Sequence, residues 1–225
     1  QVAGAGQGTD RHIGKGLVAQ YMVRMMMGQQ HFHYRLVGEG GNCLAQRLAI
    51  ALRRPAVDHH HTAVGQALLN SKAPREQIHV TSKVWWDQLQ PDAMRHSMDR
   101  SLSALRSDYV DLFMIHWPST DWDFPSTLAT LASFKEQGLA RNIGVANFPL
   151  PLLRKVVEEY GIGLSAIQVE YHVLLGQNAL LDYARQHDMA LTAYTPLARN
   201  KVSDIPQIQQ IAKKHGVLPT QVALK

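Results

Sequence analysis

Apolar runs alternate with amphipathic stretches along the chain from about Gln77 onward. The run "QIHVTSKVW" (77–85) is rich in β-branched residues and predicts a strand, and "PDAMRHSMDRSLSAL" (91–105) has apolar residues at helical spacing after Pro91 and predicts a helix. This strand and helix pair recurs four more times. The further predicted strands are 109–117, 140–148, 166–172 and 190–197, and the helices that follow them are 125–138, 149–161, 178–188 and 205–216.

The regular alternation predicts an α/β fold with a parallel sheet. Strands that are apolar almost throughout, each followed by a helix, need helices to cover the sheet. Two architectures satisfy this pattern, a (β/α)8 TIM barrel and a doubly wound open sheet, and the pattern alone does not choose between them. In both, the functional site lies at the carboxyl ends of the strands.

Polar residues stand where the predicted strands end. These residues are Lys83, His116, Asn147, Gln168 with Glu170, and Tyr194. A polar residue at a strand end can simply mark the boundary with solvent. Polar residues at all five strand ends, which include a lysine and a histidine, favour a functional site over boundary markers.

The first 76 residues lack this alternation, and we treat 10–61 as an atypical segment. It contains a methionine cluster at 25–27 and three consecutive histidines at 59–61. Adjacent histidines do not have the spacing of metal ligands on one face of a helix or strand. We therefore interpret them as part of a solvated loop and expect no bound metal.

Composition and charge narrow the class of protein. The chain has 225 residues, of which 45% are hydrophobic and 18% charged, and its formal net charge is +5. We expect one domain over 1–225, without nucleic acid as a partner because the basic residues are scattered. No apolar run reaches the length of a membrane span and no secretory signal opens the chain, so we expect a cytoplasmic protein that does not bind membranes and is monomeric.

Several motifs together identify a family. The phrases "TSKVW", "SLSALRSDYVDLFMIHWP", "KEQGLARNIGVANF", "IQVEYH" and "AYTPLARNKV" resemble the aldo-keto reductases, and most closely their bacterial 2,5-diketo-D-gluconate reductase group, over residues 62–225. The resemblance selects the (β/α)8 TIM barrel. It implies NADPH-dependent reduction of aldehydes and ketones, including keto-sugar acids such as 2,5-diketogluconate, by hydride transfer to a small-molecule carbonyl substrate.

The resemblance also implies roles for single residues. Lys83 would lower the pKa of a catalytic tyrosine, and His116 would orient the substrate carbonyl. Asn147 and Gln168 would hold the nicotinamide carboxamide while Tyr194 stacks on the ring. Thr195, Leu197 and Arg199 would meet the pyrophosphate, and Trp85, His116 and Trp117 would contact the substrate.

The sequence departs from the family pattern on the cofactor side. Ala146 stands where the family has a serine, and Ile167 replaces a common asparagine. The loss of one hydrogen bond should weaken cofactor binding by about 0.5 to 1.5 kcal/mol without abolishing it.

The catalytic tyrosine and its aspartate are not found at their expected positions. Counting back from Val64 puts Asp58 on the tyrosine position and Arg53 on the aspartate position. A shift of reading frame within 10–61 would explain this, and so would true divergence. The chain also ends within the expected seventh helix, so we expect an incomplete, truncated barrel of marginal stability that lacks its last strand and helix.

Two other functions stay open at this stage. The chain could be a catalytically inactive barrel fragment that binds a nucleotide or a protein partner. Alternatively, Lys83 could form a Schiff base with a carbonyl substrate, as in lysine aldolases.

Overall fold

The computed structural model describes residues 60–120 and 122–225, all within one compact unit, Gly38–Lys225. The predicted single domain over 1–225 stays a prediction. The methionine cluster, Arg53, Asp58 and almost all of the atypical segment lie outside the described residues. His60 and His61 belong to a helix over 60–70, so the loop interpretation was wrong for these two histidines.

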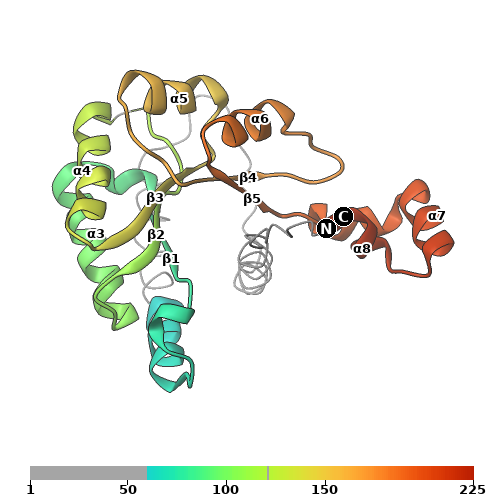
Figure 1. Ribbon diagram of the computed structural model, residues 1–225, viewed down its shortest axis with the longest axis horizontal. Coiled ribbons are helices and arrows are strands. Elements are labelled where there is room, and N and C mark those ends of the chain that lie inside the picture. Colours follow the sequence, from blue (N-terminus) through green and yellow to red (C-terminus); the bar gives the residue numbers. More distant parts are fainter. Residues whose placement is uncertain (1–59, 121) are drawn as a thin grey trace, which may run out of the picture. The chain divides into compact units, whose positions relative to one another are not determined.

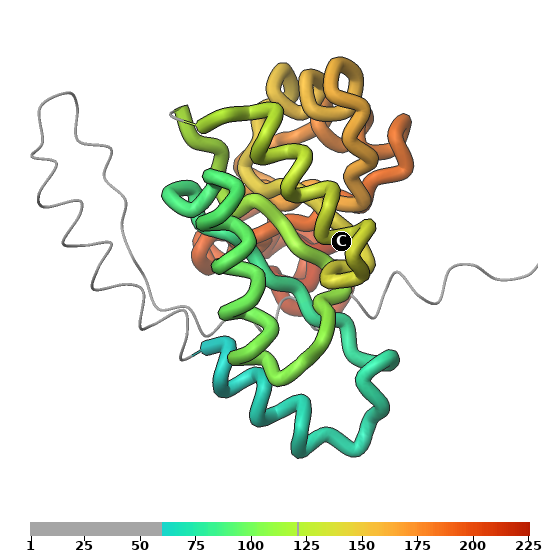
Figure 2. The backbone as a smooth tube through the Cα atoms, turned by 90° about the vertical axis from the view of Figure 1, so that its left-hand side faces the viewer, coloured from blue at the N-terminus to red at the C-terminus, as the bar shows by residue number. Residues whose placement is uncertain are grey.

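Packing explains why this helix forms. Its residues Val64 and Leu68, one helical turn apart, pack against the main core. Gly65 allows the close approach, because a Cβ atom at this position would lie 2.3 Å from the Ala104 carbonyl oxygen. In both Figure 1 and Figure 2 the helix accordingly runs beside the end of α3 (Pro91–Leu105).

Five parallel strands form one sheet in the order of the sequence. They are β1 (Thr81–Val84), β2 (Val110–Ile115), β3 (Ala140–Ala146), β4 (Ala166–Glu170) and β5 (Ala190–Tyr194) (Figure 1). All five predicted strands are confirmed, and each ends slightly earlier than its apolar run. A doubly wound sheet reverses its strand order, whereas a barrel wall does not, so the order agrees with the (β/α)8 prediction.

The helices follow the strands as predicted. The longer ones are α3, α4 (Phe124–Glu136), α6 (Asn178–Gln186) and α7 (Pro206–His215). The fourth predicted helix is divided into α5 (Leu150–Arg154) and a π-helical segment, η3 (Lys155–Glu159). The remaining elements are η1 (Arg75–Gln77), η2 (Trp86–Gln88), η4 (Ala198–Asp204) and α8 (Pro219–Leu224).

The two faces of the sheet carry different side chains. The face toward the helices contributes Phe113, Ile115 and Val145 to the main hydrophobic core. The other face contributes a smaller cluster of Leu112, Met114, Ala146 and Ala166. Alternation along each strand therefore separates a helix-covered face from an inner face, as in a barrel wall. Elements η4, α7 and α8 pack around a third cluster.

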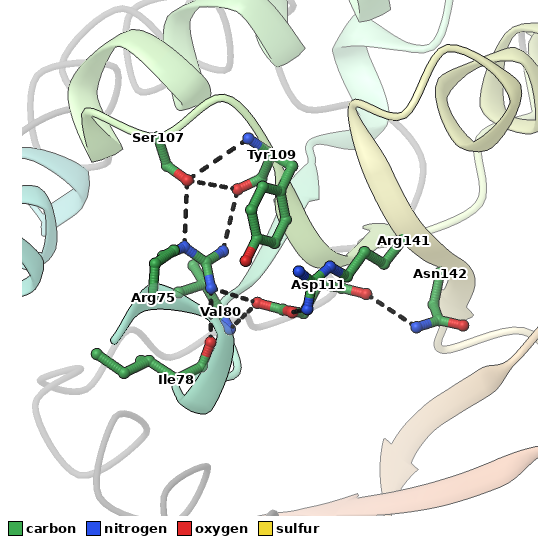
Figure 3. A network of polar contacts seen from close by, with 8 residues as sticks. All are labelled: Arg75, Ile78, Val80, Ser107, Tyr109, Asp111, Arg141 and Asn142. Carbon is green, nitrogen blue, oxygen red and sulfur yellow. Dashed lines mark hydrogen bonds and ion pairs between the residues drawn. The ribbon is translucent and has the colours of Figure 1, made fainter. Parts of the chain in front are cut away.

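A polar network holds the amino-terminal ends of β1, β2 and β3 together (Figure 3). Asp111 accepts hydrogen bonds from Arg75 at 2.8 Å, from Arg141 at 3.3 Å and from the Val80 backbone at 2.9 Å. The two guanidinium carbons lie 4.1 and 4.2 Å from the centre of the Tyr109 ring. This end of a parallel sheet contributes stability, while the functional site is expected at the other end.

Candidate functional site

The strand register places the predicted catalytic residues on the inner face at the carboxyl ends. Lys83 pairs with Met114, which belongs to the inner cluster, so Lys83 also faces inward. His116 follows two residues after Met114 and faces the same side. The His116 backbone N–H donates to the Val84 carbonyl at 2.9 Å, which continues the pairing beyond the last strand residue.

Lys83 lies partly buried on this inner face. Burial lowers the pKa of its ammonium group below the usual range. No hydrogen bond or ion pair joins this ammonium to a residue of the described part of the chain. Lys83 is therefore a buried cation without a counter-ion among the described residues, and its positive charge can stabilise a neighbouring anion.

His116 is held in its neutral form. Burial, and secondly the positive charge of Lys83, lower its pKa to about 3. The edge of the Trp85 ring packs against it, with ring centres 4.6 Å apart and an interplanar angle of 79°. A neutral imidazole has one N–H donor, so His116 can donate a hydrogen bond to a carbonyl oxygen at pH 7. Trp117 follows at the rim, with 42% of its surface exposed.

Asn147 connects this histidine to the cofactor side of the predicted site. Its Nδ2 donates to the His116 carbonyl at 2.9 Å, and its Oδ1 accepts from the Tyr194 hydroxyl at 2.8 Å. Its backbone N–H donates to the Gln168 carbonyl at 2.9 Å. The backbone of Asn147 is left-handed, with φ +62°, a conformation that asparagine tolerates better than most residues.

Gln168 lies in the same layer as Ala146, with which it pairs across β3 and β4. It is 2% exposed, and its Nε2 has no hydrogen-bond partner among the described residues. Buried amides are almost always paired, so this donor fits a ligand carbonyl. Ile167 points the other way, into the helix-covered core. The effect of Ile167 on cofactor binding stays a prediction, while Ala146 faces the inner side of the sheet beside Gln168.

Tyr194 ends β5 opposite Glu170, its partner in the register. Burial raises the pKa of its phenol, and the negative charge of Glu170 raises it further. The hydroxyl is thus neutral at pH 7 and acts as the donor to Asn147.

The segment after β5 has an unusual backbone. Thr195, Ala198, Arg199 and Asn200 all have positive φ angles, between 47° and 68°. Each left-handed non-glycine residue costs about 1 to 2 kcal/mol, so the segment stores strain of the kind that gathers at ligand sites. Leu197 caps η4. No hydrogen bond within the described residues links the side chains of Thr195 or Arg199 to Asn147 or Gln168.

The sequence analysis did not single out His172, whose ring contacts Glu170 at the end of β4. Its Nε2 lies 3.3 Å from Glu170 Oε1, and its Nδ1 accepts from the Leu174 backbone at 3.2 Å. Gln177 donates to the Glu170 carbonyl at 2.9 Å. The phrase "EYH" was the available signal, because alternation puts Glu170 and His172 on one side of the chain.

Residues 60–120 and 122–225 contain no group of three or more His, Cys, Asp or Glu side chains that could hold a metal ion. None of their helices is both long and apolar enough to cross a membrane.

Comparison with known proteins gives consistent matches. The model of the aldo/keto reductase family matches residues 59–225. Methylglyoxal reductase DkgB of Salmonella typhimurium is 37% identical over 187 residues, which cover 79% of this chain and 70% of the relative. Glyoxal reductase of Bacillus subtilis is 31% identical over 83% of this chain and 70% of its own length.

Solved structures agree with these relatives. A crystal structure described as a putative 2,5-diketo-D-gluconic acid reductase B has a TM-score of 0.71 and 34% identity, over 81% of this chain and 66% of that protein. An aldo/keto reductase from Klebsiella pneumoniae, in complex with NADP and acetate, has a TM-score of 0.68 and 25% identity, over 76% and 62% of the two chains. The chain therefore spans about two thirds of the length of these proteins.

Proposed function

Because the chain belongs to the aldo/keto reductase family, we propose that it reduces small aldehydes and ketones with NADPH, with α-oxoaldehydes such as methylglyoxal as the first substrate class to test. The observation that carries this proposal is the inner-face cluster at the strand ends. There, neutral His116 lies beside desolvated Lys83, and Gln168 lies on the cofactor side with its Nε2 unpaired among the described residues. Keto-sugar acids are a second substrate class, suggested by the description of a structural relative.

The residues on the cofactor side fit a nicotinamide. A bound NADPH would supply the hydride. The buried Gln168 Nε2 makes no hydrogen bond to another described residue and can donate to the carboxamide, and Tyr194 ends the adjacent strand, where its ring can stack. Ala146 offers no hydroxyl, so one contact fewer than in the family pattern should weaken binding by about 0.5 to 1.5 kcal/mol.

On the substrate side, His116 would orient the carbonyl. Its N–H would donate to the oxygen that gains negative charge as the hydride arrives, while Trp85 and Trp117 would form apolar walls. The charge of Lys83 would favour the anionic form of a nearby acid, which helps that acid give up its proton. None of the described residues places a hydroxyl in hydrogen-bonding contact with Lys83.

This last observation favours a second candidate function. A barrel that keeps Asn147, Gln168 and Tyr194 but has no proton donor beside Lys83 would bind the dinucleotide without turnover.

One experiment separates the two candidates. NADPH binding is measured by nicotinamide fluorescence, and NADPH oxidation is followed after methylglyoxal is added. If the chain reduces carbonyl compounds, NADPH oxidation should depend on the added methylglyoxal. The rate of oxidation should fall at least about a hundredfold in His116→Gln and Lys83→Met. It should not fall in the control Lys72→Met, which changes an exposed lysine. Binding without oxidation would instead support the inactive barrel, and the absence of both would contradict either function.

A further inference from the structure

Asn147 forms hydrogen bonds at the carboxyl ends of three other strands, the two neighbours of β3 (β2 and β4) and the next strand along, β5. Its side chain bonds to the His116 carbonyl after β2 and to the Tyr194 hydroxyl at the end of β5, and its backbone bonds to Gln168 on β4. These partners are 31, 47 and 21 residues away in the sequence. A single side chain amide therefore joins the substrate half of the candidate site to its cofactor half.

The left-handed backbone makes this arrangement possible. β3 ends at Ala146, and the φ of +62° at Asn147 turns the chain out of the strand direction. The amide can then reach sideways along the strand ends instead of alternating into one face of the sheet.

Within residues 60–120 and 122–225, Asn147 uses only half of its side-chain hydrogen-bonding capacity. A side chain amide has two N–H donors and two acceptor lone pairs, and the bonds to His116 and Tyr194 use one of each. With respect to these described residues, one N–H and one lone pair remain. Asn147 can thus hold the strand ends and bind a ligand at the same time.

We propose that Asn147 is a positioning residue, which fixes His116 through its backbone carbonyl and couples its placement to Tyr194. The role of His116 in carbonyl reduction rests on the proposed function, but its placement by Asn147 does not. Since the Trp85 ring confines His116 on one side, the bond from Asn147 restrains the remaining movement of this residue.

Asn142, which lies on β3, the strand that ends just before Asn147, provides a matched control. Its Nδ2 donates to the Asp111 carbonyl on β2 at 3.2 Å, and its Oδ1 accepts from the Ser165 hydroxyl at 3.0 Å. It makes the same two kinds of bond as Asn147, but at the amino-terminal end of the sheet. Asn142→Ala therefore tests the general cost of losing such a bridge.

The variants separate the two bonds of Asn147. Asn147→Asp removes the donor to His116 and keeps an acceptor for Tyr194, whereas Tyr194→Phe removes only the hydroxyl. Asn147→Gly removes the whole amide and accepts the positive φ without strain. If one Asn147 variant fails to fold, the comparison of the other with Tyr194→Phe and Asn142→Ala still decides.

The first measurement needs no turnover. NMR signals of the His116 ring are assigned by their loss in His116→Gln and followed in the free protein as a function of pH. Both Asn147 variants should shift these signals and raise the pH at which His116 titrates by about one unit or more, because a less restrained ring meets more water. Asn142→Ala should leave the signals in place. Unchanged His116 signals in the Asn147 variants would overturn the proposal.

The second measurement uses NADPH oxidation at saturating cofactor. Asn147→Asp should lower kcat by about ten- to a hundredfold, but in a His116→Ala background it should change kcat less than about twofold, since the two residues act together. Equal effects of Asn147→Asp in both backgrounds would mean that Asn147 acts without His116. A wild-type chain that shows no turnover would contradict the proposed function, while the NMR comparison would still test the positioning role.

Discussion

Replacement of Gln168 should affect NADPH binding and fold stability in opposite directions. The buried Gln168 Nε2 has no partner among the described residues, and an unpaired buried donor costs about 1 to 3 kcal/mol. Gln168→Leu should therefore leave the free energy of unfolding unchanged or increase it, while NADPH binding weakens about three- to tenfold. Urea unfolding and fluorescence titration measure the two effects. A variant that loses stability and keeps its affinity would contradict this prediction.

A substitution at Ala146 should strengthen NADPH binding. Ala146 faces the inner side of the sheet in register with Gln168, where the family pattern has a serine. Ala146→Ser adds a hydroxyl beside the carboxamide site and should tighten NADPH binding about two- to tenfold. The dissociation constant from fluorescence is the measurement, and Ser82→Ala on the helix-facing side of β1 provides a control that should leave it unchanged.

His116 should make the fold sensitive to acid. Its pKa in the folded protein is about 3, below the value near 6.5 of an unfolded chain. Between about pH 6.5 and pH 3 the unfolded state therefore binds a proton that the folded state does not bind. The free energy of unfolding falls by about 1.4 kcal/mol for each unit by which the pH is lowered in this range. Urea unfolding at pH 7 and pH 5 should show a smaller loss in His116→Gln than in the wild type. An equal loss would mean that His116 does not titrate in this way.

At the scale of single residues, the sequence indicates which side chains gather but not how they bond. Lys83, His116, Asn147, Gln168 and Tyr194 were found because each ends an apolar run, and the structure places them on adjacent strand ends. The bridging role of Asn147 depends on its φ of +62° and on a tyrosine 47 residues away. Neither the φ angle nor the distant tyrosine produces a local sequence pattern. The Gln168 Nε2, which has no partner in the described part of the chain, is likewise found only from the three-dimensional structure.

At the scale of elements, Asp111 is the group that ties β1, β2 and β3 at their amino-terminal ends (Figure 3). Its side chain is only 7% exposed, and that of its partner Arg75 is 20% exposed. Asp111→Ala leaves a largely buried guanidinium without its counter-ion and should destabilise the fold by about 3 to 5 kcal/mol. Arg141→Ala should cost at most about 1 kcal/mol, because that arginine is 46% exposed. Thermal unfolding of both variants tests this contrast, and similar losses would contradict it.

Elements were predictable where local signals agree. The bounds of α3 match the sequence prediction because Pro91 begins the helix and apolar residues recur at helical spacing up to Leu105. The π-helical η3 was not predictable, since "KVVEE" has no feature that separates it from an ordinary helix. The helix over 60–70 was missed for His60 and His61 because it depends on packing against α3, not on a start signal in the sequence.

At the scale of the whole molecule, cofactor binding and folding should be linked. A ligand that binds only the folded state stabilises it by about 2.7 kcal/mol at a concentration 100 times its dissociation constant. For a chain of 225 residues this corresponds to a rise in Tm of about 5 to 10 °C. The measurement is the Tm of the full chain over a series of NADPH concentrations.

Two variants test whether fold stability and NADPH binding depend on opposite ends of the sheet. Asp111→Ala acts at the end of the sheet opposite Asn147 and Gln168, so it should lower the starting Tm and leave the NADPH-dependent rise intact. Gln168→Leu should keep the starting Tm and reduce the rise at each NADPH concentration. If Tm does not depend on NADPH in the wild type, the strand ends do not bind the cofactor. If Asp111→Ala abolishes the rise, the two ends of the sheet are coupled, and stability and binding cannot be assigned to separate ends.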